Sequence, residues 1–240
     1  MKQLAPDLHI LDAPQRFLGL EVGARMTVMS LDGGLLVHSP VAVDPAVVAP
    51  LGTLRWVLAP NLLHHLHVGP WLRAGAEGWA APGLAEKRPD LCFAGVIGEA
   101  PHPFGDQIEL LATRCFPFAN EVALLHRPSR TLVLTDLVFN FSASAPWLTK
   151  AAMTCLCGYP GCRATALERV AMKRSVAREE ISTLLSWDFD RLIMAHGEVI
   201  HTGGKQALAH AYRWLSVDAV DALTTPDAAP PTASAPPHRE

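Results

Sequence analysis

Three short apolar segments, far apart along the chain, each lead into a residue that can bind a metal, and this pattern most constrains the fold. The segments are LRWVLA (54–59), TLVLT (131–135) and RLIMA (191–195). The residues that follow them are His64 and His65, Asp136, and His196. Loops beyond the carboxyl ends of strands form the functional edge of α/β sheets, so these three ends are expected to converge. Imidazole and carboxylate groups are common ligands of zinc and iron.

The rest of the pattern predicts paired strands early and helices late. Asp-Gly-Gly at 32–34, between apolar runs at 27–31 and 35–39, is typical of a hairpin. Apolar residues recur at helical spacing over 163–187, which predicts the longest helix, and 205–215 predicts the last one. This order favours a layered α/β fold with mixed sheets.

Composition limits the classes of protein that fit. Half of the 240 residues are hydrophobic, enough for one domain over residues 1–223. Residues 224–240 are rich in proline and alanine, which predicts a disordered tail. With 20 basic and 23 acidic residues and no basic block, we expect no nucleic-acid partner. The chain has no long apolar run and no apolar signal-peptide core, so we expect a cytoplasmic protein that does not bind a membrane.

Histidines cluster directly after the first segment, at His64, His65 and His67. Adjacent side chains on a strand point to opposite faces, so His64 and His65 can share one site only from an irregular turn, which we expect after Pro60. Another interpretation stays open for each candidate. Asp136 is also typical of a turn cap, and the histidines of HGEVIHTGG are also typical of a solvated loop.

The order of LRWVLAPNLLHH, ANEVALLHRPSRTLVLTDLVF and LIMAHGEVIHTGGKQAL resembles the metallo-β-lactamase-fold superfamily, and more closely one of its uncharacterised branches. The resemblance covers about residues 10–215. In that superfamily the matching segments are a His-x-His-x-Asp-His motif, a strand pair ending in a metal-bridging aspartate, and a late Gly-His-Gly loop. The resemblance implies an αββα sandwich with two mixed sheets and outer helices.

The sequence departs from this pattern at the first of the superfamily's two metal sites. Pro60 and Leu62 stand where the first two histidines belong, and CFPFANE (115–121) contains no histidine for the third ligand. The second site keeps residues of ligand type at His64, His65, Asp136 and His196. The resemblance therefore implies one divalent metal, with zinc favoured over iron. Further groups expected to orient the ligands or the substrate are His67, Asn120, Glu121 and His201.

We therefore predict a mononuclear metal-dependent hydrolase of a small ester, lactone, thioester or amide, with His64 and Asp136 in catalytic roles. Four protein ligands would close the coordination shell, whereas His64 acting as a base would leave one position open. Two alternatives remain: a non-catalytic metal-binding or ligand-binding pseudoenzyme of the same fold, and an iron-dependent oxidoreductase. Three thiols, at Cys155, Cys157 and Cys162, lack an evident fourth ligand and are interpreted as small packed side chains.

Overall fold

The computed structural model describes residues 1–218, 220 and 223, so the tail expected at 224–240 lies outside the described residues. Its larger sheet has seven strands in the order β1-β2-β5-β6-β7-β8-β9. The strands are β1 (Lys2–Ala5), β2 (Leu8–Ala13), β5 (Ala24–Leu31), β6 (Gly34–His38), β7 (Leu54–Ala59), β8 (Glu77–Ala80) and β9 (Gly95–Val96). Pairing is antiparallel from β1 to β6 and parallel from β6 to β9, so the sheet is mixed.

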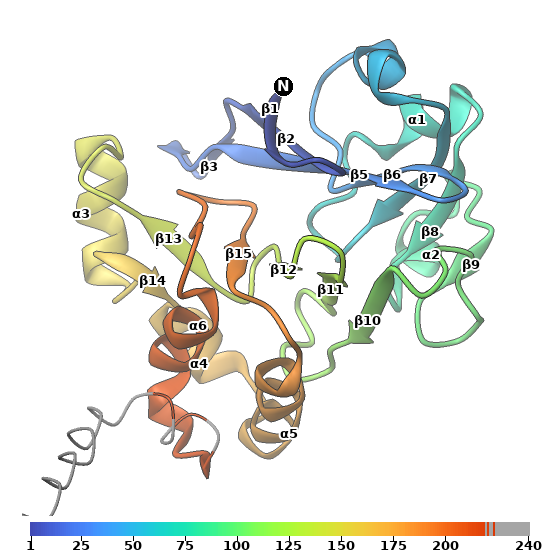
Figure 1. Ribbon diagram of the computed structural model, residues 1–240. Helices are drawn as coiled ribbons and strands as arrows, with labels where there is room; N and C mark the ends of the chain where they lie inside the picture. Colours follow the sequence, from blue (N-terminus) through green and yellow to red (C-terminus); the bar gives the residue numbers. More distant parts are fainter. Residues whose placement is uncertain (219, 221–222, 224–240) are drawn as a thin grey trace, which may run out of the picture.

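The second sheet has four strands in the order β10-β11-β12-β15. They are β10 (Ile108–Ala112), β11 (Val122–His126), β12 (Thr131–Val133) and β15 (Arg191–Ile193). The strands β12 and β15 pair in parallel, with Val133 opposite Ile193. Both strands therefore end at the same edge of the sheet, and the chain segments that follow them begin side by side (Figure 1).

Two short hairpins lie outside these sheets. They pair β3 (Arg16–Phe17) with β4 (Leu20–Glu21), and β13 (Phe139–Phe141) with β14 (Gly161–Arg163). The α-helices are α1 (Val68–Arg73), α2 (Leu84–Lys87), α3 (Trp147–Cys155), α4 (Ala166–Ala171), α5 (Arg174–Ser186) and α6 (Gly204–Tyr212). Two 3₁₀ segments, η1 (Pro45–Leu51) and η2 (Arg213–Leu215), complete the described elements. No helix in the described part of the chain is long and apolar enough to cross a membrane.

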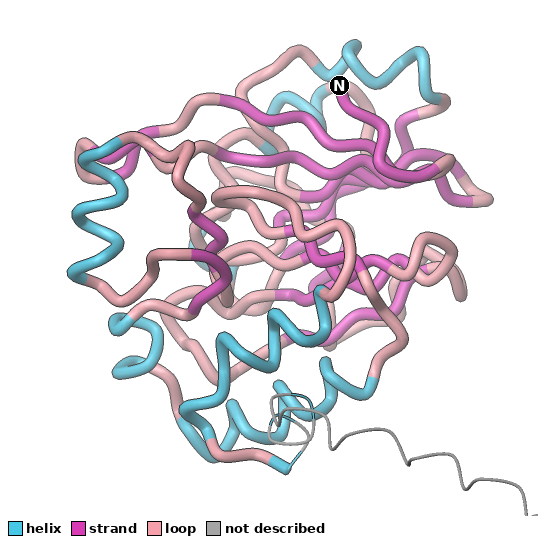
Figure 2. Tube along the Cα trace, turned by 60° about the vertical axis from the view of Figure 1, so that its left-hand side comes forward, coloured by secondary structure: helices cyan, strands magenta, loops and turns pink. Residues whose placement is uncertain are grey.

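Alternation along the strands explains how the layers pack. On β7, Trp56 and Leu58 face the second sheet, whereas Val57 packs beneath Trp71 of α1. On the second sheet, Val133 faces the core between the sheets, and Leu132 packs on the side of α5 and α6. Helices therefore cover both outer faces of a two-sheet sandwich, as Figure 2 shows, and the expected αββα architecture is confirmed.

The prediction of a single long helix over 163–187 is wrong, because the structure has two helices there. The structure divides it into α4 and α5, because the backbone is extended at Met172 (ψ 140°) and Lys173 (ψ 99°). The side chain of Met172 is buried in the core, and the amide of Lys173 donates to the Cys115 carbonyl at 2.8 Å. This hydrogen bond to a distant loop replaces a helical one, and helical spacing does not predict it.

Candidate metal centre

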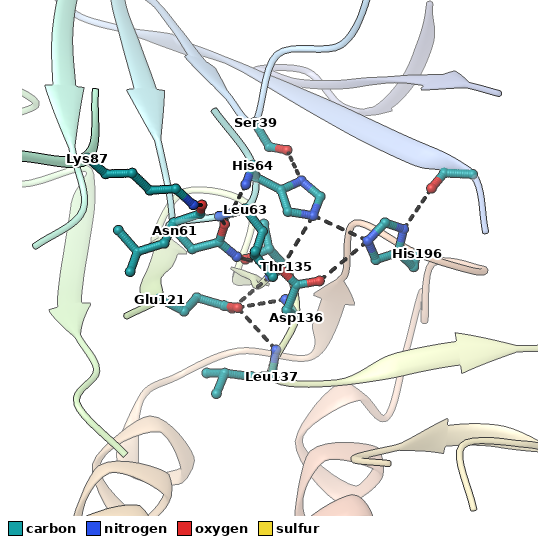
Figure 3. Close-up of polar contacts among 12 residues, drawn as sticks. Ser39, Asn61, Leu63, His64, Lys87, Glu121, Thr135, Asp136, Leu137 and His196 are labelled. Carbon is teal, nitrogen blue, oxygen red and sulfur yellow. Dashed lines mark hydrogen bonds and ion pairs between the residues drawn. The ribbon is translucent and has the colours of Figure 1, made fainter. Parts of the chain in front are cut away.

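Three side chains from three separate loops meet where the two sheets adjoin. His64 follows β7, Asp136 follows β12 and His196 follows β15. The two histidine Nε2 atoms are 3.2 Å apart. Each also approaches the Asp136 carboxylate, His64 at 3.5 Å from Oδ2 and His196 at 3.4 Å from Oδ1 (Figure 3). These residues form the group of potential metal donors found among the described residues.

The separations of these donor atoms fit a single metal ion. Ligand atoms placed tetrahedrally at about 2.0–2.1 Å from zinc lie about 3.3–3.4 Å from one another. The two imidazole Nε2 atoms, 3.2 Å apart, agree with that spacing. Each of them lies 3.4–3.5 Å from a different oxygen of Asp136, and one ligand atom from each of the three residues lies within 4.8 Å of the others. Two imidazoles and one carboxylate also suit zinc or iron chemically. The group therefore passes a test of both donor type and spacing.

Hydrogen bonds to the outer ring nitrogens orient both histidines. Nδ1 of His196 lies 2.7 Å from the Gly23 carbonyl, which only accepts, so the proton is on Nδ1 and the lone pair of a neutral ring is on Nε2. Nδ1 of His64 lies 2.9 Å from the Ser39 hydroxyl. Both Nε2 atoms thus face the same small space, and a cation placed between them would accept their lone pairs when both rings have the proton on Nδ1.

Asn61, just beyond β7, connects two of the loops that carry ligands. Its Nδ2 donates to Asp136 Oδ2 at 2.6 Å and to the Thr135 hydroxyl at 2.9 Å. Its Oδ1 accepts from the amides of Leu63 (2.8 Å) and His64 (2.6 Å). The amide thus uses its full hydrogen-bonding capacity while completely buried. Asn61 was not predicted as a site residue from the sequence. Its position two residues after the end of a predicted strand, in the loop that leads to His64, was the signal that could have identified it.

Glu121 holds the aspartate loop from its other side. Its completely buried carboxylate accepts from the amides of Thr135 (2.7 Å), Asp136 (2.6 Å) and Leu137 (3.1 Å), as Figure 3 shows. Burial and the nearby charge of Asp136 raise the pKa of Glu121 to about 7. This is the supporting position expected for Glu121 from the sequence.

Asp136 behaves in the opposite way, although it is also buried. Burial alone would raise its pKa, but the charges and hydrogen bonds of His64 and His196 outweigh burial and hold the pKa well below its usual range. For His196, burial lowers the pKa, but the hydrogen bond and charge of Asp136 leave it raised. Two buried carboxylates lie in one site, and a divalent cation would offset both of their charges.

The structure does not bring His65 to this group, which corrects the expectation of four ligands. His65 points away from His64, and its Nδ1 lies 2.8 Å from Nη1 of Arg88. Arg88 is itself held by the Asp90 carboxylate at 2.6 Å. Burial and the charges of Lys87 and Arg88 lower the pKa of His65. The turn after Pro60 therefore brings His64 to the donor group but not His65.

The other supporting residues expected from the sequence lie in different positions. His67 precedes α1 and borders a small hollow of about 20 Å³ that also reaches His64. Asn120 donates to the Pro82 carbonyl at 3.2 Å, and His201 is exposed. Cys155 and Cys157 are exposed free thiols, and Cys162 is a half-buried one. None of these residues belongs to the donor group found in the described chain.

A cleft of about 640 Å³ lies next to the donor group. Gly23, whose carbonyl binds His196, lines it, as do Ala195 and Gly197 on either side of His196. Arg16 and Glu21 of the hairpin β3–β4 border it as well, as do residue 142 and residues 144–146. The small hollow at His64 shares Gln15 and Ala24 with this cleft, so the two lie next to each other.

Comparison of the whole structure with solved structures identifies the architecture. A metallo-β-lactamase from Erythrobacter litoralis aligns with a TM-score of 0.65 at 11% identity, over 89% of this chain and 94% of that one. The metallo-β-lactamase from Pontibacter korlensis gives 0.60 at 11% identity, over 89% and 97%. FIM-1 from Pseudomonas aeruginosa, solved in a mono-zinc form, gives 0.59 at 8% identity, over 89% and 94%.

The sequence alone matches no family model and no curated protein. The likeness is therefore one of fold, and it extends over nearly the full length of those lactamases. Together with the two mixed sheets, the outer helices and the donor group at the junction of the sheets, it leads to one identification. The chain has the metallo-β-lactamase fold.

Proposed function

We propose that this protein is a metal-dependent hydrolase of a small ester, lactone, thioester or amide, with one divalent metal held by His64, Asp136 and His196. The observation that carries the proposal is the convergence of His64, Asp136 and His196, whose ligand atoms all lie within 4.8 Å of one another. Three protein ligands are characteristic of catalytic zinc sites, whereas structural sites usually have four. The position of His65 against Arg88 leaves the donor group at three.

The residues around the donors have distinct parts in this proposal. Ser39 and the Gly23 carbonyl hold the two imidazole rings, and Asn61 holds the carboxylate, so the three donors are ordered before a metal binds. A divalent metal supplies Lewis-acid polarisation of a carbonyl group. We assign His64 the role of a ligand in place of a free base, because its Nε2 faces the other donors.

The substrate would bind in the cleft beside His196. Its volume of about 640 Å³ is within the usual range of small-molecule sites. We propose a small-molecule substrate and no nucleic-acid partner, since the chain has a net charge of −3. We also propose a cytoplasmic location, because all five cysteines are free thiols in the structure.

A second function has one specific observation in its favour. Two histidines and one carboxylate with open positions are also the ligand set of non-haem iron(II) oxygenases. An iron-dependent oxidoreductase would use the same three residues, so the identity of the metal distinguishes the two proposals. We favour zinc because the 3.2 Å between the two imidazole Nε2 atoms is close to the separation of two tetrahedral zinc ligands.

The test combines metal analysis with hydrolysis. The purified full-length protein should contain about one equivalent of zinc by elemental analysis. It should hydrolyse at least one of p-nitrophenyl acetate, a thioester or an N-acyl lactone, and should lose this activity in chelator and regain it with zinc. One equivalent of iron would favour the oxidoreductase. A folded protein that binds neither metal would overturn both and leave a non-catalytic module.

A further inference from the structure

The cleft beside the donor group contains more carboxylates than cationic side chains. Its charged lining residues are Asp12, Arg16, Glu21, Arg25 and Glu198. Three carboxylates and two guanidiniums give this lining a formal charge of −1. Some of these charged groups form ion pairs with each other and one does not. The group outside the ion pairs is the one available to a charged ligand.

Both arginines already have carboxylate partners. Nη2 of Arg16 lies 2.6 Å from Oε1 of Glu21, in a pair that is largely exposed. Nε of Arg25 lies 2.7 Å from Oδ1 of Asp12. Arg25 is 92% buried, and its Nη1 donates to the Met194 carbonyl at 2.8 Å, which ties this side chain to the loop before His196.

Glu198 has no arginine partner within ion-pair distance among the described residues, yet it is firmly held. Its amide donates to the Asn140 carbonyl at 2.8 Å, and its own carbonyl accepts from Asn140 Nδ2 at 2.8 Å. Its Oε1 accepts from the hydroxyls of Ser142 and Ser144, the latter at 2.9 Å. No described residue is hydrogen-bonded to Oε2. One carboxylate oxygen is therefore ordered and free to bind a ligand.

Glu198 belongs to the same loop as His196 of the donor group. Glu198 is two residues after His196, and both Gly197 and Glu198 line the cleft. The remaining lining includes apolar surface from Pro14, Val22, Phe141 and Pro146. A molecule lying in the cleft would thus meet an apolar wall and the ordered carboxylate of Glu198, which is two residues along the chain from His196. Net negative charge in a cleft concentrates cations there.

We propose that this cleft binds a substrate that carries a positively charged group, an ammonium or a guanidinium, and that Glu198 is the specificity-determining residue that binds it. This inference rests on the proposed function in one respect, that the bound molecule is the substrate of the hydrolase. It adds the chemical class of that substrate, an amine-bearing ester, lactone, thioester or amide. The ordered hydroxyl partners reduce the entropic cost of fixing the carboxylate for each binding event.

The experiment measures binding separately from turnover. The probes are butylammonium, butanol and butyrate, three small molecules of similar length that differ in charge. Their dissociation constants from the full-length protein are measured by NMR titration. We expect butylammonium to bind at least about 5-fold more tightly than butanol, with butyrate weakest, and the difference to shrink as salt rises. Equal affinities for all three probes would overturn the proposal.

Two variants test whether Glu198 causes the preference for butylammonium. Glu198→Gln removes the charge and keeps an oxygen that Ser142 and Ser144 can bind, so the preference for butylammonium should disappear. Glu21→Gln changes the charge of the same cleft by the same amount and should keep most of the preference. Equal losses in the two variants would mean general electrostatics and would reject the assignment to Glu198. Circular dichroism and metal content verify that both variants are folded and loaded.

Turnover then separates this inference from the proposed function. Alanine p-nitrophenyl ester and propionic acid p-nitrophenyl ester differ by one ammonium group. Wild type should have a several-fold lower KM for the first ester, and Glu198→Gln should lose this advantage with little change in kcat. Metal-dependent hydrolysis of both esters with equal KM would overturn the inference alone. Ammonium binding that depends on Glu198, without metal-dependent hydrolysis, would overturn the proposed function alone.

Discussion

His64 and His65 are adjacent in sequence, yet they lie in two chemically different regions. The inner region contains His64, Asp136 and His196, whose ligand atoms all lie within 4.8 Å of one another. The outer region contains His65 and Arg88, joined at 2.8 Å. The neighbours of each ring, and not the histidine residue itself, decide whether it can serve as a ligand.

The two regions differ in the sign of the charges that surround each ring. Asp136 lies beside His64, and two buried carboxylates accompany the inner group. Lys87 and Arg88 lie beside His65 and lower its pKa together with burial. A cation is stabilised in the inner region and repelled in the outer one. Substitutions at His196, Asn61 and His65 should therefore have different effects on metal binding and on stability.

The largest effect should come from removing an inner donor. His196→Ala should lower zinc affinity by more than about 100-fold, since changes to groups behind the ligands already cost 10–100-fold. The fold should persist, because outside the donor group the ring makes one hydrogen bond, to the Gly23 carbonyl. Competition with a chromophoric chelator measures the affinity, and circular dichroism verifies the fold. Unchanged affinity in a folded variant would remove His196 from the site.

The next largest effect on zinc binding should come from Asn61, whose side-chain amide connects the loop of His64 with the loop of Asp136. Asn61→Ala removes hydrogen bonds to Asp136, Thr135, Leu63 and His64, and should weaken zinc binding by about 10–100-fold. Cobalt(II) substituted for zinc should show an altered absorption spectrum, because Asp136 is no longer held in one orientation. Ser39→Ala, which removes one contact to His64, is the milder control. A spectrum identical to wild type would make Asn61 a purely structural residue.

A smaller effect should appear in the pH dependence of stability. The folded-state pKa of His65 is lowered, so below the unfolded value of about 6.5 the unfolded state binds more protons. Its contribution to stability is therefore present above that pH and is lost as the pH falls. His65→Asn should lose less stability than wild type between pH 7 and 5, by at most about 1.4 kcal/mol per pH unit. Urea unfolding of metal-free protein measures this, and parallel curves would contradict the assignment.

The smallest effect on zinc binding should come from His65, which lies outside the donor group. His65→Ala should change zinc affinity by less than about 3-fold, because its ring lies against Arg88 and outside the donor group. The loss of one hydrogen bond should lower the free energy of unfolding by about 1 kcal/mol. The chelator competition used for His196→Ala gives the direct comparison. A large loss of zinc would return His65 to the ligand set.

The sequence was informative wherever the physical cause is local. Short apolar runs and turn signals predicted strands at 27–31, 35–39, 54–59 and 131–135, and the structure has strands at each of these places. The small hairpins and α3 were not predicted, because short segments carry little periodic signal. The break between α4 and α5 depends on a hydrogen bond from Lys173 to Cys115, 58 residues away, and no local pattern predicts it.

For the site, the sequence by itself determined which residues of ligand type follow the strands, and three of those predicted, His64, Asp136 and His196, lie together. Tertiary structure alone decided that His65 is excluded and that Asn61, Ser39 and the Gly23 carbonyl hold the donors. The hydrogen bond from His196 to Gly23 spans 173 positions. Contacts of this kind depend on how two sheets pack, whereas strand ends depend on neighbouring residues.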